Sequence, residues 1–417
     1  MDSFTIKGGS KIQGEVRVSG SKNSSLPVLF STVLTSEKCV IKNVPDLMDI
    51  KSTFDMLSYA GKNCFFGFNL FSAGEGKKLK TEAPYELVRK MRASVLIAGP
   101  LLARFHHVKF ALPGGCAIGV RPIDIHLEGF KKMGAKISYE EGNVILKADR
   151  LKGARIKLAF PSVGATENLM MAAALIDDLT EIRNAAREPE ISDLAGALRK
   201  MGAEIEGDGT PVLKVRGKTR LRGFEHSVIP DRIEAGTFLI LCAALGGSLK
   251  VTEIVPEHLK VLIKKLKESG AQLYVGRDYV EIKAPARIKS VNISTGPYPA
   301  FPTDLQAQWM AYMTLASGTS RIQENIFENR FMHAAELMRM GADIKIKRNC
   351  AFIKGVKGLS GATVMASDLR AGAALLLAGA AASGKTRIRR VYHIDRGYDR
   401  IEEKMRCAGV KMERAKE

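Results

Sequence analysis

The stretch LRKMGAEI, residues 198–205, decides the fold because variants of it return along the whole chain. In it an amphipathic run ends at Gly202, and glycine is the residue that most often ends a helix. The glycines of successive copies are 73, 68, 68, 71 and 68 residues apart. The copies are MLSYAGKN (56–63), FKKMGAKI (130–137), LRKMGAEI (198–205), LKESGAQL (266–273), LMRMGADI (337–344) and MRCAGVKM (405–412). One structural unit is therefore written six times.

An apolar segment precedes each of these exit glycines. The segments are NSSLPVLFSTVL (23–34), MRASVLIAGPLLARF (91–105), GATENLMMAAALI (164–176), IEAGTFLILCAAL (233–245), TDLQAQWMAYMTLA (303–316) and DLRAGAALLLAGAA (368–381). They are apolar nearly all round, which predicts buried helices of about 14 residues. Short alternating stretches stand between each buried helix and the exit helix, and others follow the glycine. The predicted unit is strand, helix, strand, helix and then a β-hairpin.

The two ends of the sequence predict how the last repeat is completed. After Gly409 only VKMERAKE remains, so the sixth copy lacks its hairpin. Residues 4–20, FTIKGGSKIQGEVRVSG, alternate like a strand pair with no helix of their own. We expect the N-terminus to complete the last unit. This gives one three-repeat domain at residues 21–229 and another formed by residues 1–20 plus 230–417, each of a usual domain size.

Composition is typical of a globular protein, with 46% hydrophobic and 26% charged residues. We find no membrane-spanning stretch and no export signal, and expect a cytoplasmic protein without membrane association. Six cysteines are scattered without a CxxC pair or nearby histidines, so we expect no metal site. We expect most of the cysteines to be small hydrophobes of a reduced protein, and we expect no cofactor.

The charge balance of 64 Lys and Arg against 44 Asp and Glu gives a net charge of +20. Such a field attracts polyanions, and nucleic acid is one class of partner. The basic residues form no tract, do not interleave with aromatic residues and accompany no nucleic-acid motif. Small anionic substrates explain the same charge, and we expect no nucleic-acid partner.

The second copy has the longest interval, and its extra residues fit the segment ALPGGCAIGVRPIDIHL, residues 111–127. Pro113 and three glycines break both periodicities around Cys116, which predicts a mobile loop. Arg121 and the start of a helix near Pro122 would favour the thiolate form of Cys116. The alternative is a glycine-rich turn with an incidental cysteine.

Polar residues stand at corresponding points, where the buried helices begin. A charge at the mouth of an apolar helix is costly to bury, so we expect a shared cleft that holds phosphates and carboxylates. For Glu167, Glu234 and Arg232 a helix cap or a local ion pair is the favoured alternative. Arg396 and Glu190 precede exit helices and could reach the same cleft. The helix-start residues are Lys22 with Asn23, Arg92, Thr166 with Glu167, Arg232 with Glu234, Asp304 and Arg370.

Ten segments carry a resemblance that spacing alone does not supply. They are GSKNSSLP (20–27), MRASV (91–95), LPGGCAIGVRPID (112–124), PSVGATEN (161–168), NAAREPEI (184–191), PDRIEAGTF (230–238), PAFPTDLQAQ (299–308), FENRFMH (327–333), DLRAGAALLLAG (368–379) and YHIDRGYDRIEEK (392–404). Together they resemble the UDP-N-acetylglucosamine 1-carboxyvinyltransferase family of enolpyruvyl transferases, essentially end to end. The resemblance implies an inside-out α/β barrel with two domains of three βαβαββ units each. It also implies enolpyruvyl transfer from phosphoenolpyruvate to the 3′-hydroxyl of UDP-N-acetylglucosamine, the reaction that opens peptidoglycan synthesis.

The resemblance also implies residue roles. Cys116 corresponds to the proton donor, Asp304 to the carboxylate that accepts the hydroxyl proton, and Glu190 to a residue that helps to shuttle protons. Phosphoenolpyruvate would be held by Lys22, Asn23, Arg121, Arg370 and Arg396. The positions implied for the nucleotide sugar are Arg92, Arg121, Pro122, Ile123, Asp124, Ile125, Phe160, Pro161, Ser162, Val163, Asp304 and Ile326.

The sequence departs from the family in two places. The common motif GAKNAA reads GSKNSS here, which changes the small residues beside Lys22 and keeps the lysine. The segment AFPSVGATEN has no basic residue at Phe160 or Pro161, which bears on the uracil contacts.

Two other functions compete with this prediction. A 3-phosphoshikimate 1-carboxyvinyltransferase would share the fold and donor, and the PGGC loop argues against it. A nucleic-acid-binding repeat protein would show salt-sensitive binding and no phosphate release.

Overall fold

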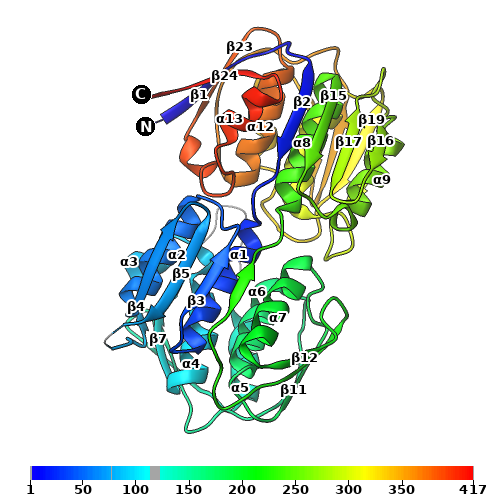
Figure 1. Ribbon diagram of the computed structural model, residues 1–417. Coiled ribbons are helices and arrows are strands. Elements are labelled where there is room, and N and C mark those ends of the chain that lie inside the picture. The colour runs from blue at the N-terminus through cyan, green and yellow to red at the C-terminus, as the bar shows by residue number, and fades with distance from the viewer. Residues whose placement is uncertain (1, 77, 113–122, 417) are drawn as a thin grey trace. The chain divides into compact units, whose positions relative to one another are not determined.

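The computed structural model describes residues 2–76, 78–112 and 123–416, and they form two compact units (Figure 1). We call residues 20–229, with the two gaps, the internal unit. Residues 2–19 and 230–416 make up the terminal unit, which contains both chain ends. Cys116, Arg121 and Pro122 lie outside the described residues. Each unit has its own apolar core.

All six sheets of the described chain share one arrangement of four strands. An edge strand runs parallel to the second strand, and the third and fourth strands are antiparallel to their neighbours. In four of the six sheets a crossover through the buried helix joins the parallel pair, whereas β14 with β3 and β2 with β15 pair across a longer stretch of chain. A short turn joins the third and fourth strands except in the last sheet, where β1 and β24 come from opposite ends of the chain. The sequence pattern of strand, helix, strand, helix and hairpin is therefore confirmed.

Three of these sheets belong to the internal unit. In spatial order, they consist of β14 (Glu225–Ser227), β3 (Cys39–Lys42), β5 (Leu70–Glu75) and β4 (Lys62–Gly67); β6 (Glu82–Ala83), β7 (His107–Ala111), β9 (Asn143–Lys147) and β8 (Lys136–Glu140); and β10 (Arg155–Lys157), β11 (Leu179–Arg183), β13 (Val212–Arg216) and β12 (Glu204–Glu206).

The terminal unit repeats the same order. Its sheets consist of β2 (Ile12–Arg17), β15 (Gly247–Thr252), β17 (Tyr279–Lys283) and β16 (Gln272–Val275); β18 (Ile293–Ser294), β19 (Thr319–Gln323), β21 (Cys350–Lys354) and β20 (Asp343–Lys347); and β22 (Thr363–Met365), β23 (Lys385–Arg389), β1 (Asp2–Lys7) and β24 (Lys411–Lys416).

The apolar segments form the buried helices, but three of the six are interrupted. A 3₁₀ turn ends the first and begins the second and the fifth. The buried segments are α1 (Lys22–Ser31) with η1 (Thr32–Leu34), η2 (Arg92–Ile97) with α4 (Ala98–Phe105), α6 (Val163–Ala173), α8 (Arg232–Leu245), η4 (Thr303–Leu305) with α10 (Gln306–Met313), and α12 (Leu369–Ala381).

The exit helices end as the glycine pattern predicts. All six exit glycines have φ between 94° and 113°, a conformation that only glycine adopts without strain. The exit helices are α2 (Met48–Tyr59), α5 (Asp124–Lys132), α7 (Pro189–Met201), α9 (Lys260–Glu268), α11 (His333–Arg339) and α13 (Ile401–Cys407). Three short helices complete the described set: α3 (Tyr85–Val88), η3 (Pro256–Leu259) and η5 (Val391–His393).

The N-terminal strands are divided between two sheets. Strand β1 lies between β23 and β24 and completes the sixth sheet, as expected, so both chain ends lie side by side (Figure 1). Strand β2 instead pairs with β15, so the expectation that the whole N-terminal pair joins the last unit is wrong. In the internal unit β14 pairs with β3 at the corresponding position. Strand β2 therefore belongs to a sheet of the terminal unit, and the chain enters the internal unit after it. Strand β14 belongs to a sheet of the internal unit, and the chain returns to the terminal unit after it.

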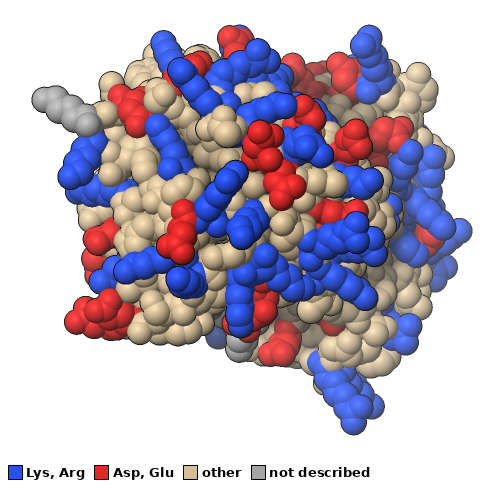
Figure 2. Space-filling view, turned by 90° about the horizontal axis from the view of Figure 1, so that it is seen from below, with Lys and Arg blue, Asp and Glu red and all other residues tan. Residues whose placement is uncertain are grey.

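Basic and acidic side chains are intermixed on the face shown in Figure 2. Lys and Arg side chains cover much of the face shown in Figure 2, and acidic side chains lie among them. Among the described residues, no helix combines the length and apolar character needed to cross a bilayer.

Candidate active site

The candidate site of the terminal unit is built around Asp304. Its Oδ1 accepts a hydrogen bond from Arg330 at 2.9 Å, and its Oδ2 accepts one from Arg370 at 3.0 Å. The two arginine side chains are buried, with exposed fractions of 4% and 3%, whereas that of Asp304 is 26% exposed. Two buried cations therefore present one partly exposed carboxylate. Buried Asp231 adds a second negative charge near Arg370.

Arg370 is fixed where α12 begins. Asp368 caps this helix, and its carboxylate accepts hydrogen bonds from the backbone N–H groups of Arg370 and Ala371. Burial alone would lower the pKa of Arg370, but Asp304, Tyr398 and Asp231 raise it above its ordinary value. The guanidinium also lies 5.4 Å from the centroid of the Tyr398 ring. Arg370 is thus a permanent buried cation.

Buried Glu324 organises the two loops beside Asp304. It accepts hydrogen bonds from Thr303, next to Asp304, at 2.9 Å and from Thr295 at 2.8 Å. It also accepts from the backbone N–H groups of Ile326, at 2.8 Å, and Phe327. A single carboxylate therefore links the loop of Ile326 to the turn of Asp304, although these residues are far apart in sequence.

The turn that carries Arg396 packs on the start of α12. A Cβ atom on Gly397 would lie 2.4 Å from a methyl carbon of Leu369, and one on Gly372 would lie 2.4 Å from buried Ile394. Both glycines therefore permit a close approach that a larger residue would prevent. The turn is seated on the same helical turn that carries Arg370.

In the internal unit, Lys22 begins α1 and is already paired. Its Nζ lies 2.9 Å from the buried carboxylate of Asp49, on α2. Ser21 caps α1 by accepting a hydrogen bond from the backbone N–H of Ser24. Lys22 and its neighbour Asn23 thus occupy the first turn of the helix, where the backbone N–H groups also attract anions.

Ser24, one of the three serines that distinguish GSKNSS from the family motif, takes part in a buried network. Ser24 Oγ donates to Asp193 Oδ2, and Asp193 Oδ1 lies 2.8 Å from His226 Nε2. The backbone N–H of Ile229 reaches the same carboxylate at 3.4 Å. Asp193 therefore connects the start of α1 to α7 and to the end of β14.

Arg92 begins η2 and influences a buried histidine. Burial, and then the charge of Arg92, lower the pKa of His126 to about 4. Asn168 holds this histidine in place, because its amide lies 3.1 Å from Nδ1 and also donates to Val95. His126 stands on α5, two residues after Asp124, so Arg92 lies near the start of that helix. Ile123 is buried, Ile125 is partly buried and Asp124 is exposed.

Carboxylates gather where α6 and α7 begin. Burial raises the pKa of Glu167 well above its usual value, and the charges of Glu190 and Glu188 raise it further. Glu190 lies in the first turn of α7 and is also buried. For Glu167, a local ion pair or a helix cap was the wrong prediction: it forms no ion pair among the described residues, and Ser162 is the cap of α6. Glu234 does have the expected ion pair, with Lys404.

The segment before α6 contributes apolar surface. Phe160 is 40% exposed, and Pro161, Ser162 and Val163 are partly buried. Ser162 accepts a hydrogen bond from the backbone N–H of Ala165 at 3.3 Å. The segment therefore offers an exposed aromatic ring beside a capped helix start.

Sequence reasoning missed several residues of these clusters, among them Glu324 and Asp368. Asp49, Asp193 and Arg330 act as buried partners of predicted residues or of their helices. Arg330 stands in the segment FENRFMH, whose resemblance to the family was the only signal that could have found it. No group of three or more metal-ligating side chains occurs in the part of the chain that the structure describes.

Comparisons with known proteins agree with this architecture. Residues 6–405 match the family described as EPSP synthase (3-phosphoshikimate 1-carboxyvinyltransferase). The enolpyruvyl transferase NikO from Streptomyces tendae superposes with a TM-score of 0.90 at 24% identity, over 99% of both chains. EPSP synthase from Acinetobacter baumannii gives a TM-score of 0.77 at 17% identity, over the full length of both chains. The chain belongs to this enolpyruvyl transferase family, and the predicted two-domain inside-out α/β fold is confirmed.

Relatives with higher sequence identity narrow the assignment within this family. The chain is 54% identical to a UDP-N-acetylglucosamine 1-carboxyvinyltransferase of Elusimicrobium minutum, over 99% of both chains. It is 52% identical to the protein of that name from Geotalea uraniireducens over the full length of both. The predicted resemblance is therefore confirmed, and the chain is a transferase.

Proposed function

We propose that this chain transfers the enolpyruvyl group of phosphoenolpyruvate to the 3′-hydroxyl of UDP-N-acetylglucosamine and releases phosphate. The observation that carries the proposal is the full-length identity of about half to enzymes of that name. The reaction would supply the first committed intermediate of peptidoglycan synthesis. We place it in the cytoplasm, in accord with the five described cysteines, none of which forms a disulfide.

The candidate residues fall into two sets, one for each proposed substrate. Lys22, Asn23, Arg121, Arg370 and Arg396 bind the phosphate and carboxylate of phosphoenolpyruvate. Buried Arg370 supports this role, because a guanidinium matches the oxygens of a phosphate or a carboxylate. Arg92, residues 121–125, residues 160–163 and Ile326 contact the nucleotide sugar. The exposed ring of Phe160 supports an apolar contact with uracil.

The proposed chemistry is an addition followed by an elimination. Cys116 gives a proton to the methylene carbon of phosphoenolpyruvate, and the sugar oxygen forms a bond to the adjacent carbon. Asp304 orients the hydroxyl and accepts its proton late, because a carboxylate held by two cations is a weak base for an alcohol. The resulting ketal loses phosphate as the methyl carbon gives back one proton and the double bond returns. Cations around the departing phosphate stabilise its charge.

Glu190 and Glu167 support a route for protons in the internal unit. A carboxyl group whose pKa is raised can hold a proton near neutral pH, and Glu167 meets this condition. We assign proton shuttling to Glu190, with Glu167 as its neutral neighbour.

A phosphate-release assay tests the proposal. Purified protein is mixed with phosphoenolpyruvate and with either UDP-N-acetylglucosamine or shikimate 3-phosphate. We expect phosphate release only with the nucleotide sugar. Release with shikimate 3-phosphate would favour a 3-phosphoshikimate 1-carboxyvinyltransferase instead. Release with neither, together with salt-sensitive binding of nucleic acid, would favour the repeat protein that binds polyanions.

Substitution of Cys116 tests the chemical role of the thiol. We expect Cys116→Ser to impair turnover, and an epoxide of the fosfomycin type to inactivate the wild-type protein. Cys116→Asp should resist that epoxide while it retains turnover, because a carboxylic acid can also donate a proton. Full sensitivity of the Cys116→Asp variant would remove Cys116 from this role.

A further inference from the structure

Arg414, in the last strand β24, holds a network at the edge of the terminal unit. Its guanidinium lies 2.6 and 3.0 Å from the two carboxylate oxygens of Asp395. It also donates to both oxygens of Glu402, at 2.8 and 3.3 Å, and to Asp2 at 3.2 Å. These contacts use all five N–H groups of an arginine side chain. We call Arg414, Asp395, Glu402 and Asp2 the Arg414 network.

The network brings together four elements that are separate in sequence. Asp2 belongs to β1, Arg414 to β24 and Glu402 to α13, whereas Asp395 lies in the turn after η5. Arg414 stands opposite Phe4 in the pairing of β24 with β1, and its guanidinium lies 4.6 Å from the centroid of that buried ring. The strand pairing therefore sets where the guanidinium lies, and the carboxylates of the turn and of α13 meet it there.

The Arg414 network has more hydrogen bonds than an ordinary surface ion pair. The Arg414 side chain is 27% exposed, and its contacts with Asp395 and Glu402 are both bidentate. Exposed single pairs contribute little to stability, whereas bidentate contacts in a network are the exception. Hydrogen bonds to Asp395 raise the pKa of Arg414 above its ordinary value, followed by those to Glu402. The guanidinium is thus fully committed to protein carboxylates and has no N–H left for a substrate.

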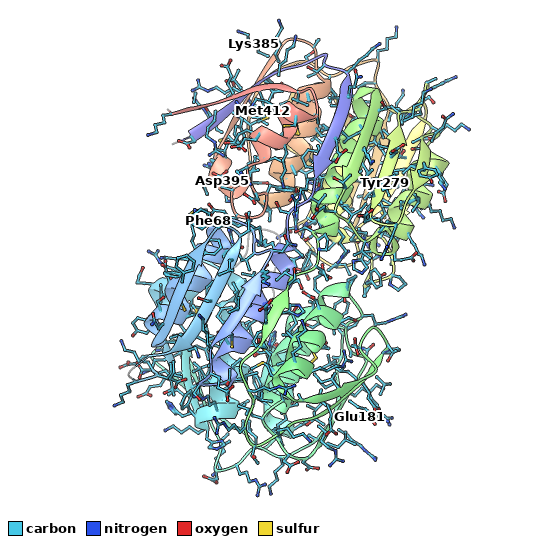
Figure 3. The ribbon with its side chains drawn as sticks, in the orientation of Figure 1. Phe68, Glu181, Tyr279, Lys385, Asp395 and Met412 are labelled. Atoms are coloured by element: carbon cyan, nitrogen blue, oxygen red, sulfur yellow. The ribbon has the colours of Figure 1, made fainter. Side chains whose placement is uncertain are left out.

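We propose that Arg414 is a positioning residue that fixes Arg396 for phosphoenolpyruvate, an inference that rests on the proposed function. Asp395 and Arg396 are adjacent in the turn, which rests on α12 through Ile394 and Gly397. Packing on α12 supports one side of this turn. Arg414 binds the carboxylate of Asp395, which is labelled in Figure 3. Without Arg414, Asp395 would be free to compete with substrate anions for nearby cations, and the turn would lose its second attachment.

Steady-state kinetics of the full-length protein test this role with four variants. We expect Arg414→Gln to raise the KM for phosphoenolpyruvate about tenfold, as loss of a supporting contact behind a binding residue typically does. Arg414→Lys should give a smaller increase because it keeps one ion pair. The KM for UDP-N-acetylglucosamine should change less than about twofold. Asp395→Asn should resemble Arg414→Gln, whereas Glu402→Gln should leave the KM for phosphoenolpyruvate nearly unchanged, because Glu402 lies on α13 and not in the turn.

Arg339→Gln is the matched control. Arg339 is an exposed arginine of the same unit, paired with Glu336 on its own helix α11. If Arg414→Gln lowers the melting temperature but leaves the KM for phosphoenolpyruvate at the value of this control, the positioning role is refuted.

A second measurement is independent of turnover. Amide hydrogen exchange of residues 394–398 should accelerate in Arg414→Gln relative to the wild-type protein and the control. Unchanged exchange there would overturn the inference even if the wild-type chain showed no activity. If exchange accelerates in Arg414→Gln but the wild-type protein releases no phosphate, the positioning role stands and the proposed function fails instead.

Discussion

The cluster around Asp304 in the terminal unit and the cluster around Glu167 in the internal unit carry different charges near helix starts. In the terminal unit, two buried guanidiniums enclose Asp304 where the buried helices begin. In the internal unit, Glu167 lies near Glu188 and Glu190, and burial with these like charges raises its pKa. Copies of one repeat therefore carry different charges near the starts of their helices. In the internal unit the raised pKa of Glu167 favours its protonated form, whereas in the terminal unit two guanidiniums hold the carboxylate of Asp304.

The largest expected effect comes from removing the carboxylate between the arginines. Asp304→Asn should lower turnover about 100-fold or more, the usual loss for a group that handles a proton in the reaction. Phosphate release measures this loss. Asp343→Asn, an exposed position of the same unit, serves as the control. Turnover near the wild-type value would mean that the arginines alone define the site.

A smaller effect is expected for the partner of Lys22. Asp49→Asn should raise the KM for phosphoenolpyruvate about tenfold, because it removes the charge that positions the lysine ammonium. Asp46→Asn is a matched control, since Asp46 pairs with Lys51 at the surface at 2.8 Å. Equal KM values for the two variants would contradict a role for Asp49 in the site.

The buried carboxylates should make stability depend on pH in a defined direction. Burial raises the pKa of Glu234 from 4.5 to about 7, although Lys404 opposes the change. The stability that the protonated group contributes is fully present below pH 4.5 and is lost as pH rises through about 7. The difference in unfolding free energy between Glu234→Gln and wild type should therefore rise with pH by about 3 kcal/mol and then level off.

Glu167→Gln extends this test to the internal unit. Its pKa is also raised, so the variant should likewise gain stability relative to wild type as pH rises above 4.5. Among the described residues no cation opposes the shift, unlike at Glu234. Denaturant titrations at several pH values measure both differences. A difference that stays flat between pH 4.5 and 8 would show that Glu167 is ionised in the folded protein.

The smallest effect is expected at Ser24. Ser24→Ala removes one hydrogen bond to Asp193 and should cost about 1 kcal/mol of unfolding free energy. The KM for phosphoenolpyruvate should stay within about threefold, because Lys22 keeps its own partner, Asp49. Ser52→Ala, whose exposed hydroxyl donates only to Met48 of its own helix, should cost less. A larger loss for Ser52→Ala would exclude the network as a source of stability.

The scaffold could be predicted because its rules are local. An exit glycine needs a positive φ and a buried helix needs apolar residues all round, and both leave a pattern that recurs six times. The pairing of β2 with β15 and of β14 with β3 could not be predicted. Both β2 and β14 are short alternating stretches before a helix, and nothing in their residues names β15 or β3 as partner. Pairing of distant strands is a property of the tertiary fold.

The same distinction holds for the site. Lys22, Asp304 and Arg370 stand at helix starts that the repeat marks, so their positions could be read from the sequence. Their partners could not. Arg330 is 26 residues from Asp304, and Arg414 is 19 residues from Asp395. Only folding brings these charges together. In the sequence, a charged residue outside the repeat pattern cannot be told from an ordinary surface charge.

The division of β1 and β2 between two sheets has a consequence for synthesis on the ribosome. Strand β1 leaves the ribosome first, but its neighbours β23 and β24 are made last. At about 5–20 residues per second, roughly 20–80 seconds separate them. During this interval the internal unit has all its strands and can fold, while β1 exposes an unpaired edge that carries Phe4 and Ile6. Among the described strands, β1 therefore waits longest for its partners.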